Sequence, residues 1–163
     1  MNILGIDPGF ADMGYGVLSV EGGSEKMIVC GSIRTFAGAP LSERLLSIHT
    51  ALLDLIRTHQ PQAAAVERLF FSKNAKTAIA VAEARGVILL TLEQCGVRVV
   101  EFNPADVKLA VCGHGAAEKI QVQKMVARLL GLAEVPKPDD AADALALALT
   151  LAHWNANIRQ SAS

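Results

Sequence analysis

The chain has 163 residues, of which 52% are hydrophobic and 19% are charged, and its formal net charge is −1. This length fits one domain, and the composition excludes an intrinsically disordered chain. A charge near zero gives no support for nucleic-acid binding, because DNA-binding domains are usually basic. If four carboxylates bound divalent cations, removing their four negative charges from −1 would leave +3. The charge is therefore compatible with a DNA substrate without indicating one.

The sequence predicts a cytoplasmic protein with no membrane span and no secretory signal. The apolar run at residues 141–152 is too short to cross a bilayer and is interrupted by a charge. The first apolar stretch ends at Asp7 and has no charged segment before it. Three widely spaced cysteines favour free thiols over a zinc site or a disulfide: Cys30, Cys95 and Cys112.

In chain order, the sequence predicts three strands and then helices that alternate with single strands. Apolar runs bounded by turn residues predict strands at residues 2–6, 15–20, 26–35, 63–66 and 98–102. Apolar residues at helical spacing predict helices at residues 42–60, 75–94, 105–111, 117–130 and 139–154. Ser42 and Asn74 are expected to cap the first two helices.

The element order β-β-β-α-β-α-β-α-α-α predicts an α/β fold with a mixed sheet. The turn at residues 21–24 predicts a hairpin, which makes the first part of the sheet antiparallel. The later strands alternate with helices and should add in parallel. We expect one domain over residues 1–155, followed by a polar, disordered tail over residues 156–163.

Two acidic residues end predicted strands, and each has a structural interpretation as well as a functional one. Asp7 stands before Pro8 and Gly9, a sequence that forms turns. Glu67 follows a buried apolar strand, where a charge is costly unless it is paired or bound to a metal. The alternative for Glu67 is an exposed strand end paired with Arg68.

Two further acids, Asp140 and Asp143, are three residues apart in the first turn of the last predicted helix, which places both on one face. Acids at a helix start also interact favourably with the helix dipole and cap free amides, and Asp139, the first acid of the group, is expected to be a simple cap. The rest of this helix is apolar and should pack on the sheet, with its start near the strand ends. Because three segments then converge, we expect one site formed by Asp7, Glu67, Asp140 and Asp143.

A group of carboxylates at this place is typical of metal-dependent phosphodiester hydrolysis. Two divalent cations about 3.5–4 Å apart can stabilise both the attacking and the leaving oxygen. Hard cations such as Mg²⁺ or Mn²⁺ prefer carboxylate and water oxygens. The sequence therefore predicts a nuclease that uses metal ions.

Several motifs in this order resemble those of the RuvC-type Holliday junction resolvases, the crossover junction endodeoxyribonucleases of bacteria. The resemblance covers residues 2–154, nearly the whole chain. Its motifs are Ile3-Leu-Gly-Ile-Asp-Pro-Gly9, Gly14-Tyr-Gly16, Val66-Glu67 with Phe70 and Lys73-Asn74, Ala84-Arg-Gly86, Ala117-Glu-Lys119 with Gln121-Val-Gln123, and Asp140-Ala-Ala-Asp-Ala-Leu145.

The resemblance implies a ribonuclease H-like fold, with a five-stranded mixed sheet flanked by helices, and a homodimer that nicks a four-way DNA junction at two symmetric places. It assigns the catalytic and metal-binding tetrad to Asp7, Glu67, Asp140 and Asp143. It also implies attack by water with two Mg²⁺ or Mn²⁺ ions per site, leaving 5′-phosphate and 3′-hydroxyl ends, in recombination and repair. The implied partners are the branch-migration proteins RuvA and RuvB.

Five side chains are expected to contact DNA. Phe70 could stack on an unpaired base, while Lys73 and Lys76 beside it hold phosphate. Lys108 and Lys119 match basic positions of the family, and exposed amides near the start of the helix carrying Lys119 can also bind phosphate. The alternatives are a buried position for Phe70 and solvated helix faces for the lysines.

Three other functions are compatible with parts of this pattern. Actin-like ATPases also begin with a strand, an aspartate and a glycine-rich hairpin, but they need two such lobes. An inactive junction-binding module would share the fold, although unpaired clustered carboxylates are unfavourable without metal. A nuclease of the same fold that acts on RNA–DNA hybrids is the third alternative.

Overall fold

The computed structural model describes the backbone of residues 1–69 and 75–161 and the side chains of residues 1–69 and 78–154. The strands are β1 (Asn2–Asp7), β2 (Asp12–Glu21), β3 (Ser24–Arg34), β4 (Ala63–Glu67) and β5 (Arg98–Phe102). The helices are α1 (Leu41–His59), α2 (Ala75–Gln94), α3 (Pro104–Cys112), α4 (Lys119–Leu129) and α5 (Asp139–Ser161). The predicted order of elements is confirmed. Within this described part, none of the helices has the length and apolar character needed to cross a membrane.

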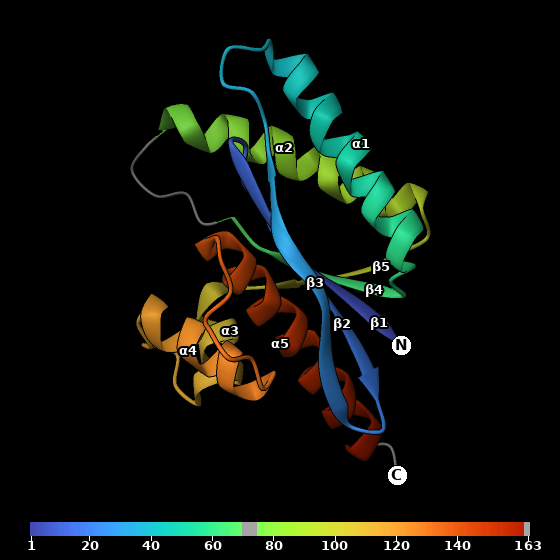
Figure 1. Cartoon of the computed structure of the whole chain (residues 1–163). Coiled ribbons are helices and arrows are strands. Elements are labelled where there is room, and N and C mark those ends of the chain that lie inside the picture. Colours follow the sequence, from blue (N-terminus) through green and yellow to red (C-terminus); the bar gives the residue numbers. More distant parts are fainter. Residues whose placement is uncertain (70–74, 162–163) are drawn as a thin grey trace.

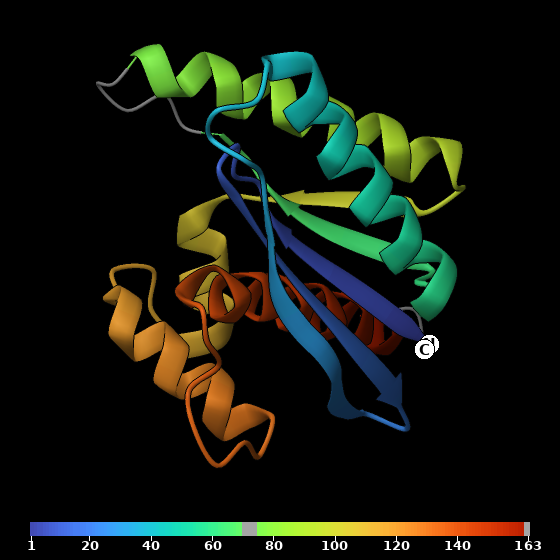
Figure 2. The same cartoon turned by 45° about the horizontal axis from the view of Figure 1, so that its top comes forward.

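The strands form one mixed sheet in the order β3-β2-β1-β4-β5 (Figures 1 and 2). β2 pairs antiparallel with both β1 and β3, and the β2–β3 turn places Gly22 and Gly23 at positive φ. β4 pairs in parallel with both β1 and β5. The predicted α/β fold with a five-stranded mixed sheet flanked by helices is therefore confirmed.

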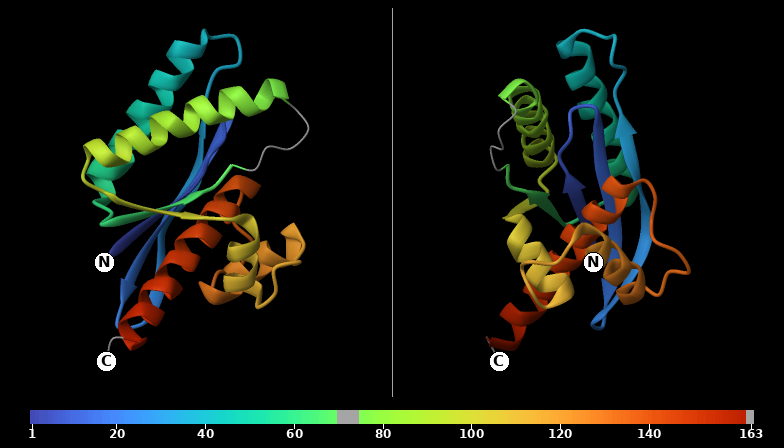
Figure 3. Two further views of the ribbon diagram at one scale, coloured as in Figure 1. Left: turned by 180° about the vertical axis from the view of Figure 1, so that it is seen from behind. Right: turned by 90° about the vertical axis from the view of Figure 1, so that its left-hand side faces the viewer.

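Helices cover the sheet in two layers, with α1 and α2 on one face and α5, α3 and α4 on the other (Figure 3). Alternate residues of a strand point to opposite faces. In β1, Leu4 and Ile6 accordingly pack in a cluster with Ile48 of α1, whereas Ile3 packs in a second cluster with Leu145 of α5. Both faces of the sheet are therefore buried under helices.

The start of α1 differs from the prediction that Ser42 caps it. The helix begins at Leu41 with Pro40 as its N-cap, and the Pro40 carbonyl accepts bonds from the amides of Glu43 and Arg44. Ser42 lies inside the first turn. The apolar spacing used for the prediction marks the buried face of a helix but not its first turn. The predicted cap at Asn74 lies outside the described residues.

The start of α4 and the end of α5 also differ from the prediction. α4 begins at Lys119 rather than Ala117, because the amide of Glu118 donates to the side chain of Gln121 (2.8 Å) in a capping box. α5 continues to Ser161, beyond the expected end at Trp154, and no glycine or proline stops it. The backbone at residues 156–161 is therefore helical, where a disordered tail was expected. The domain boundary at residue 155 stays a prediction.

Candidate active site

One end of the sheet collects the predicted acidic residues. The parallel strands β1 and β4 end beside each other, at Asp7 and Glu67. Gly5 faces α5, and Asp7 shares that face because side chains alternate along a strand. The first strand therefore presents Asp7 toward the helix that carries the other two predicted carboxylates.

Two glycines allow α5 to lie directly on β1 and β2. A Cβ at Gly5 would lie 1.8 Å from the backbone oxygen of Ala144, and one at Gly14 would lie 2.1 Å from that of Asp140. Any larger residue would therefore push the helix away from the strands. This close approach carries the first turn of α5, with Asp140 and Asp143, to Asp7.

Three of the four predicted carboxylates form a compact group. One oxygen atom from each of Asp7, Asp140 and Asp143 lies within 4.8 Å of the other two. Glu67 is not in this group, but it lines the same cleft as Asp7 and Asp143. The structure thus brings together the segments that the sequence pointed to. The catalytic role of each carboxylate stays a prediction.

The electrostatics of this group favour either protons or cations. The pKa of Asp7 is raised from 3.8 to about 7, mainly by burial and further by the charges of Glu67, Asp143 and Asp140. Burial also raises the pKa of Glu67, with a further contribution from Asp143. The pKa of Asp140 is raised by burial and by the nearby Asp12. Without a cation, the group would therefore hold protons at pH values where isolated carboxylates are ionised.

Lys119 reaches the acidic group from the first residue of α4. Its Nζ lies 2.8 Å from Asp143 Oδ2 and 3.9 Å from Asp139 Oδ2. The hydrogen bond to Asp143 is the main cause that raises the pKa of Lys119. About half of the Lys119 side chain stays exposed (53%), so its ammonium can also meet a bound anion. Asp139, at 69% exposure, is the more peripheral acid.

The other predicted DNA contacts divide into one that the structure places and three that it does not. Lys108, on α3, lines the cleft with Asp7 and Lys119. The start of α3 is fixed by Pro104 in its first turn. The three remaining positions lie within residues 70–76 of the sequence. Phe70 and Lys73 lie outside the described residues, as does the side chain of Lys76.

The donor set of the cleft fits hard divalent cations. Its oxygen donors are carboxylates held close to one another, and the pKa of Asp7 is raised by burial and by repulsion from the neighbouring acids, both of which a bound cation would offset. A bound divalent metal would stabilise charge on phosphoryl oxygens and lower the pKa of a water molecule. The site therefore suits hydrolysis of a phosphate ester.

One arginine of the motif Ala84-Arg-Gly86, to which the sequence analysis assigned no role, supports the site from the opposite layer. Arg85 of α2 forms an ion pair with Glu101 of β5, and its Nε donates to the backbone oxygen of Glu67 (3.4 Å). The sequence signals were this motif and a charge inside an apolar helix. A charge at such a place needs a partner, but the sequence does not identify the partner.

The comparison with known families decides which hydrolase this is. The family model described as "Crossover junction endodeoxyribonuclease RuvC" matches residues 3–151, most of the chain. The chain belongs to the RuvC family. A RuvC crossover junction endodeoxyribonuclease of Caldicellulosiruptor saccharolyticus is 52% identical over 91% of this chain and 90% of its own length. That of Chloroflexus aggregans is 52% identical over 94% of this chain and 93% of its own length.

Solved RuvC structures agree with this fold. The Thermus thermophilus RuvC structure superposes with a TM-score of 0.90 at 38% identity, covering 96% of each chain. T. thermophilus RuvC in complex with a Holliday junction substrate gives the same TM-score and identity, over 95% of this chain and 94% of that one. The predicted ribonuclease H-like fold is confirmed, and the chain is an endodeoxyribonuclease of the RuvC family, whose members are metal-dependent. The alternative of an actin-like ATPase was wrong.

Proposed function

We propose that this nuclease resolves Holliday junctions by paired symmetric nicks, in homologous recombination and DNA repair. The observation that carries the proposal is the group formed by Asp7, Asp140 and Asp143 in a chain that shares its fold with a RuvC bound to a Holliday junction. Each nick would be a hydrolysis that leaves a 5′-phosphate and a 3′-hydroxyl end. Such ends can be joined again by a ligase.

Each carboxylate has a role in this proposal. Asp7, Asp140 and Asp143, with Glu67 across the cleft, would hold two Mg²⁺ or Mn²⁺ ions. The ions would supply charge stabilisation at the phosphoryl oxygens and an acidic water molecule. The protein's own part is to fix the carboxylates and to hold the DNA strand. Lys119 lies close enough to Asp143 to place its charge beside the scissile phosphate.

The remaining predicted contacts position the junction. Lys108 lines the same cleft and would bind the phosphate backbone. Phe70, with Lys73 and Lys76 near it, would stack on an unpaired base at the centre of the junction.

A homodimer would explain how two nicks are paired. A four-way junction has approximate two-fold symmetry, so two copies of one site can meet two strands of like polarity. The helix α2 carries large apolar side chains that stay exposed in the single chain, Ile79 at 65% and Leu90 at 58%. We place the dimer seam there. RuvA and RuvB, as branch-migration proteins, would deliver the mobile junction.

The test compares a mobile four-way junction with a linear duplex of the same sequence, in Mg²⁺ or Mn²⁺. The wild-type protein is expected to nick only the junction, at two symmetric places. Asp7→Asn is expected to bind the junction but leave it uncut. The nick ends would be typed by ligation without further treatment, which requires a 5′-phosphate and a 3′-hydroxyl.

The other outcomes discriminate between functions. Tight junction binding without cleavage in either metal would indicate an inactive binding module. Equal cutting of junction and duplex would leave a nuclease without junction selectivity. Preferential cutting of an RNA–DNA hybrid would indicate the third alternative raised by the sequence.

A further inference from the structure

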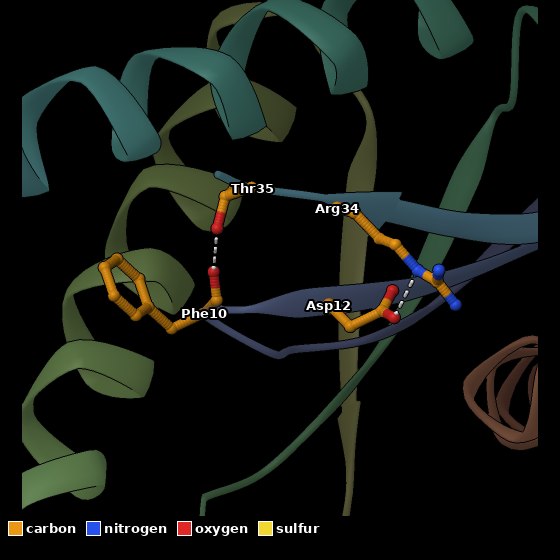
Figure 4. A network of polar contacts seen from close by, with 4 residues as sticks. All are labelled: Phe10, Asp12, Arg34 and Thr35. Atoms are coloured by element: carbon orange, nitrogen blue, oxygen red, sulfur yellow. Dashed lines mark hydrogen bonds and ion pairs between the residues drawn. The ribbon is translucent and has the colours of Figure 1, made fainter. Parts of the chain in front are cut away.

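A basic side chain on the far side of the acidic group has no role in the function proposed above. Arg34 is the last residue of β3 and pairs across the sheet with Asp12, the first residue of β2. Its Nε donates to Asp12 Oδ2 at 3.0 Å, and 73% of its side chain is exposed. The rest of the guanidinium therefore faces solvent. Figure 4 shows the two side chains meeting at the neighbouring ends of the strands.

The strand register puts this pair on the face that carries the carboxylates. Asp7 lies opposite Gly14 in the β1–β2 ladder, so Asp12, two residues away from Gly14, points to the same side as Asp7. Arg34, opposite Asp12, shares that side. Figure 4 shows Phe10 pointing the other way, toward the α1 and α2 layer.

Asp140 lies next to the pair. Its backbone oxygen would be 2.1 Å from a Cβ at Gly14, and the charge of Asp12 contributes to its raised pKa. These charged residues therefore form a row, from Asp7 to Asp140 and then to Asp12 and Arg34. Arg34 is at the β3 edge of this row.

The two lysines that line the cleft lie on the other side of α5. Lys108 is on α3 and Lys119 on α4, and both helices pack against one side of α5, whereas β3 lies on its other side (Figure 1). A nucleic-acid strand carries one negative charge at each nucleotide. A strand lying across the acidic group would therefore meet the two lysines on one side of the cut and needs a cation on the other.

We propose that Arg34, oriented by Asp12, binds a backbone phosphate of the junction on the β3 side of the cut. This inference rests on the proposed function. A guanidinium suits the position because it can keep one edge on a carboxylate while the other edge binds phosphate. The alternative, an ordinary surface ion pair, would contribute roughly 0–1 kcal/mol to stability and nothing to DNA binding.

The experiment measures junction binding as a function of salt, in an Asp7→Asn background that binds without cutting. Arg34→Gln is expected to weaken binding several-fold. It should also lower the slope of log affinity against log salt by about 0.9 for each bound protomer, the value for one lost phosphate contact. Arg34→Lys keeps the charge and should restore most of the slope. Lys26→Gln, at the opposite end of the same strand and exposed, is the matched control.

The outcomes separate this inference from the function on which it rests. If Arg34→Gln and Lys26→Gln give the same affinity and slope as the background protein, Arg34 does not bind phosphate, although the wild type still resolves junctions. If the wild type shows no junction selectivity, the proposed function fails first. Thermal unfolding of Arg34→Gln checks the fold, since loss of a surface ion pair should hardly change it.

Discussion

The face of the sheet under α5 and the face under α1 and α2 differ in what stands between helix and strand. On the α5 side, Gly5 and Gly14 leave no side chain in the way, and the helix backbone lies directly on the strands. On the other side, Leu4 and Ile6 meet Ile48 of α1 through branched side chains. One face therefore keeps a close backbone contact where the other keeps an ordinary hydrophobic layer.

The difference shows how the fold separates chemistry from stability. The close contact brings Asp140 and Asp143 to Asp7, and the cost is repulsion between partly buried charges. The branched residues of the other face bury apolar surface without any charge, at about 25 cal/mol for each Å². We therefore expect changes on the α5 face to alter metal binding and activity. Changes to the branched apolar residues of the other face should alter stability alone.

The largest expected effect is that of Asp7→Asn. Cleavage should be lost, while the metal-free protein becomes more stable at neutral pH. The folded pKa of Asp7 is about 7, against 3.8 ordinarily, so between these values only the folded state keeps the proton. The free energy of unfolding of metal-free wild type should therefore fall as pH rises from about 4 to 7, by at most roughly 4 kcal/mol.

Denaturant unfolding across this pH range, with a chelator present, measures the effect. Asp7→Asn should flatten the curve, and adding Mg²⁺ at pH 7.5 should stabilise the wild type but hardly the variant. Asp54→Asn, at an exposed position on α1, is the control and should leave the wild-type pH dependence intact. If the unfolding free energy of Asp7→Asn depended on pH as strongly as that of the wild type, ionisation of Asp7 would not destabilise the metal-free fold.

Gly5→Ala tests the close contact itself. The new methyl group would lie 1.8 Å from the Ala144 backbone oxygen, so α5 must shift. We expect a loss of about 3 kcal/mol in unfolding free energy, at the upper end for an overpacked core, and a rise in the Mg²⁺ concentration needed for cleavage. Both follow from moving Asp140 and Asp143 away from Asp7.

The matched control for Gly5→Ala is Gly86→Ala on the other layer. A Cβ at Gly86, an exposed position inside α2, would meet nothing within 4 Å. Alanine there should stabilise the helix by about 0.5–1 kcal/mol. The comparison would fail if both alanines had the same small effect, because α5 could then accept a side chain between itself and β1.

Arg85→Lys tests a contact that runs from the α2 layer to the site. Lysine keeps the charge but cannot hold both Glu101 and the Glu67 carbonyl as the arginine does. We expect a loss of about 1.5 kcal/mol in stability and a higher Mg²⁺ requirement for cleavage, with junction affinity unchanged. Arg57→Lys, exposed at the end of α1, should change neither quantity.

Much of this architecture follows from local patterns in the sequence. Apolar runs between turn residues predicted the five strands, and apolar residues at helical spacing predicted the five helices, of the part of the chain that the structure describes. The acids at the strand ends and at the start of α5 were found for a related reason. A charge next to a long apolar run must lie where the run leaves the core. The glycine contacts were not predicted, since small residues in a strand have several explanations.

The Asp12–Arg34 pair shows why the strand register could not be predicted from the sequence. Counting from the turn between Glu21 and Ser24 would place Asp12 opposite Ile33. A β-bulge at Val17/Leu18 shifts the ladder by one residue, which brings Arg34 opposite Asp12 instead. A one-residue shift exchanges the faces of a strand, and nothing local in the sequence marks the bulge.

The smallest expected effect is that of Ile48→Val, in the apolar layer between α1 and the sheet. Ile48 is fully buried in the layer between α1 and the sheet, and loss of one methyl group should cost about 1 kcal/mol in unfolding free energy. Cleavage per folded molecule and the Mg²⁺ concentration for half-maximal activity should stay at wild-type values. Ile48→Val and Arg85→Lys should lose similar amounts of unfolding free energy. A difference in their Mg²⁺ requirement would therefore come from the geometry of the site and not from stability. A shift in the metal requirement of Ile48→Val would show that packing on the α1 face also sets the carboxylate positions.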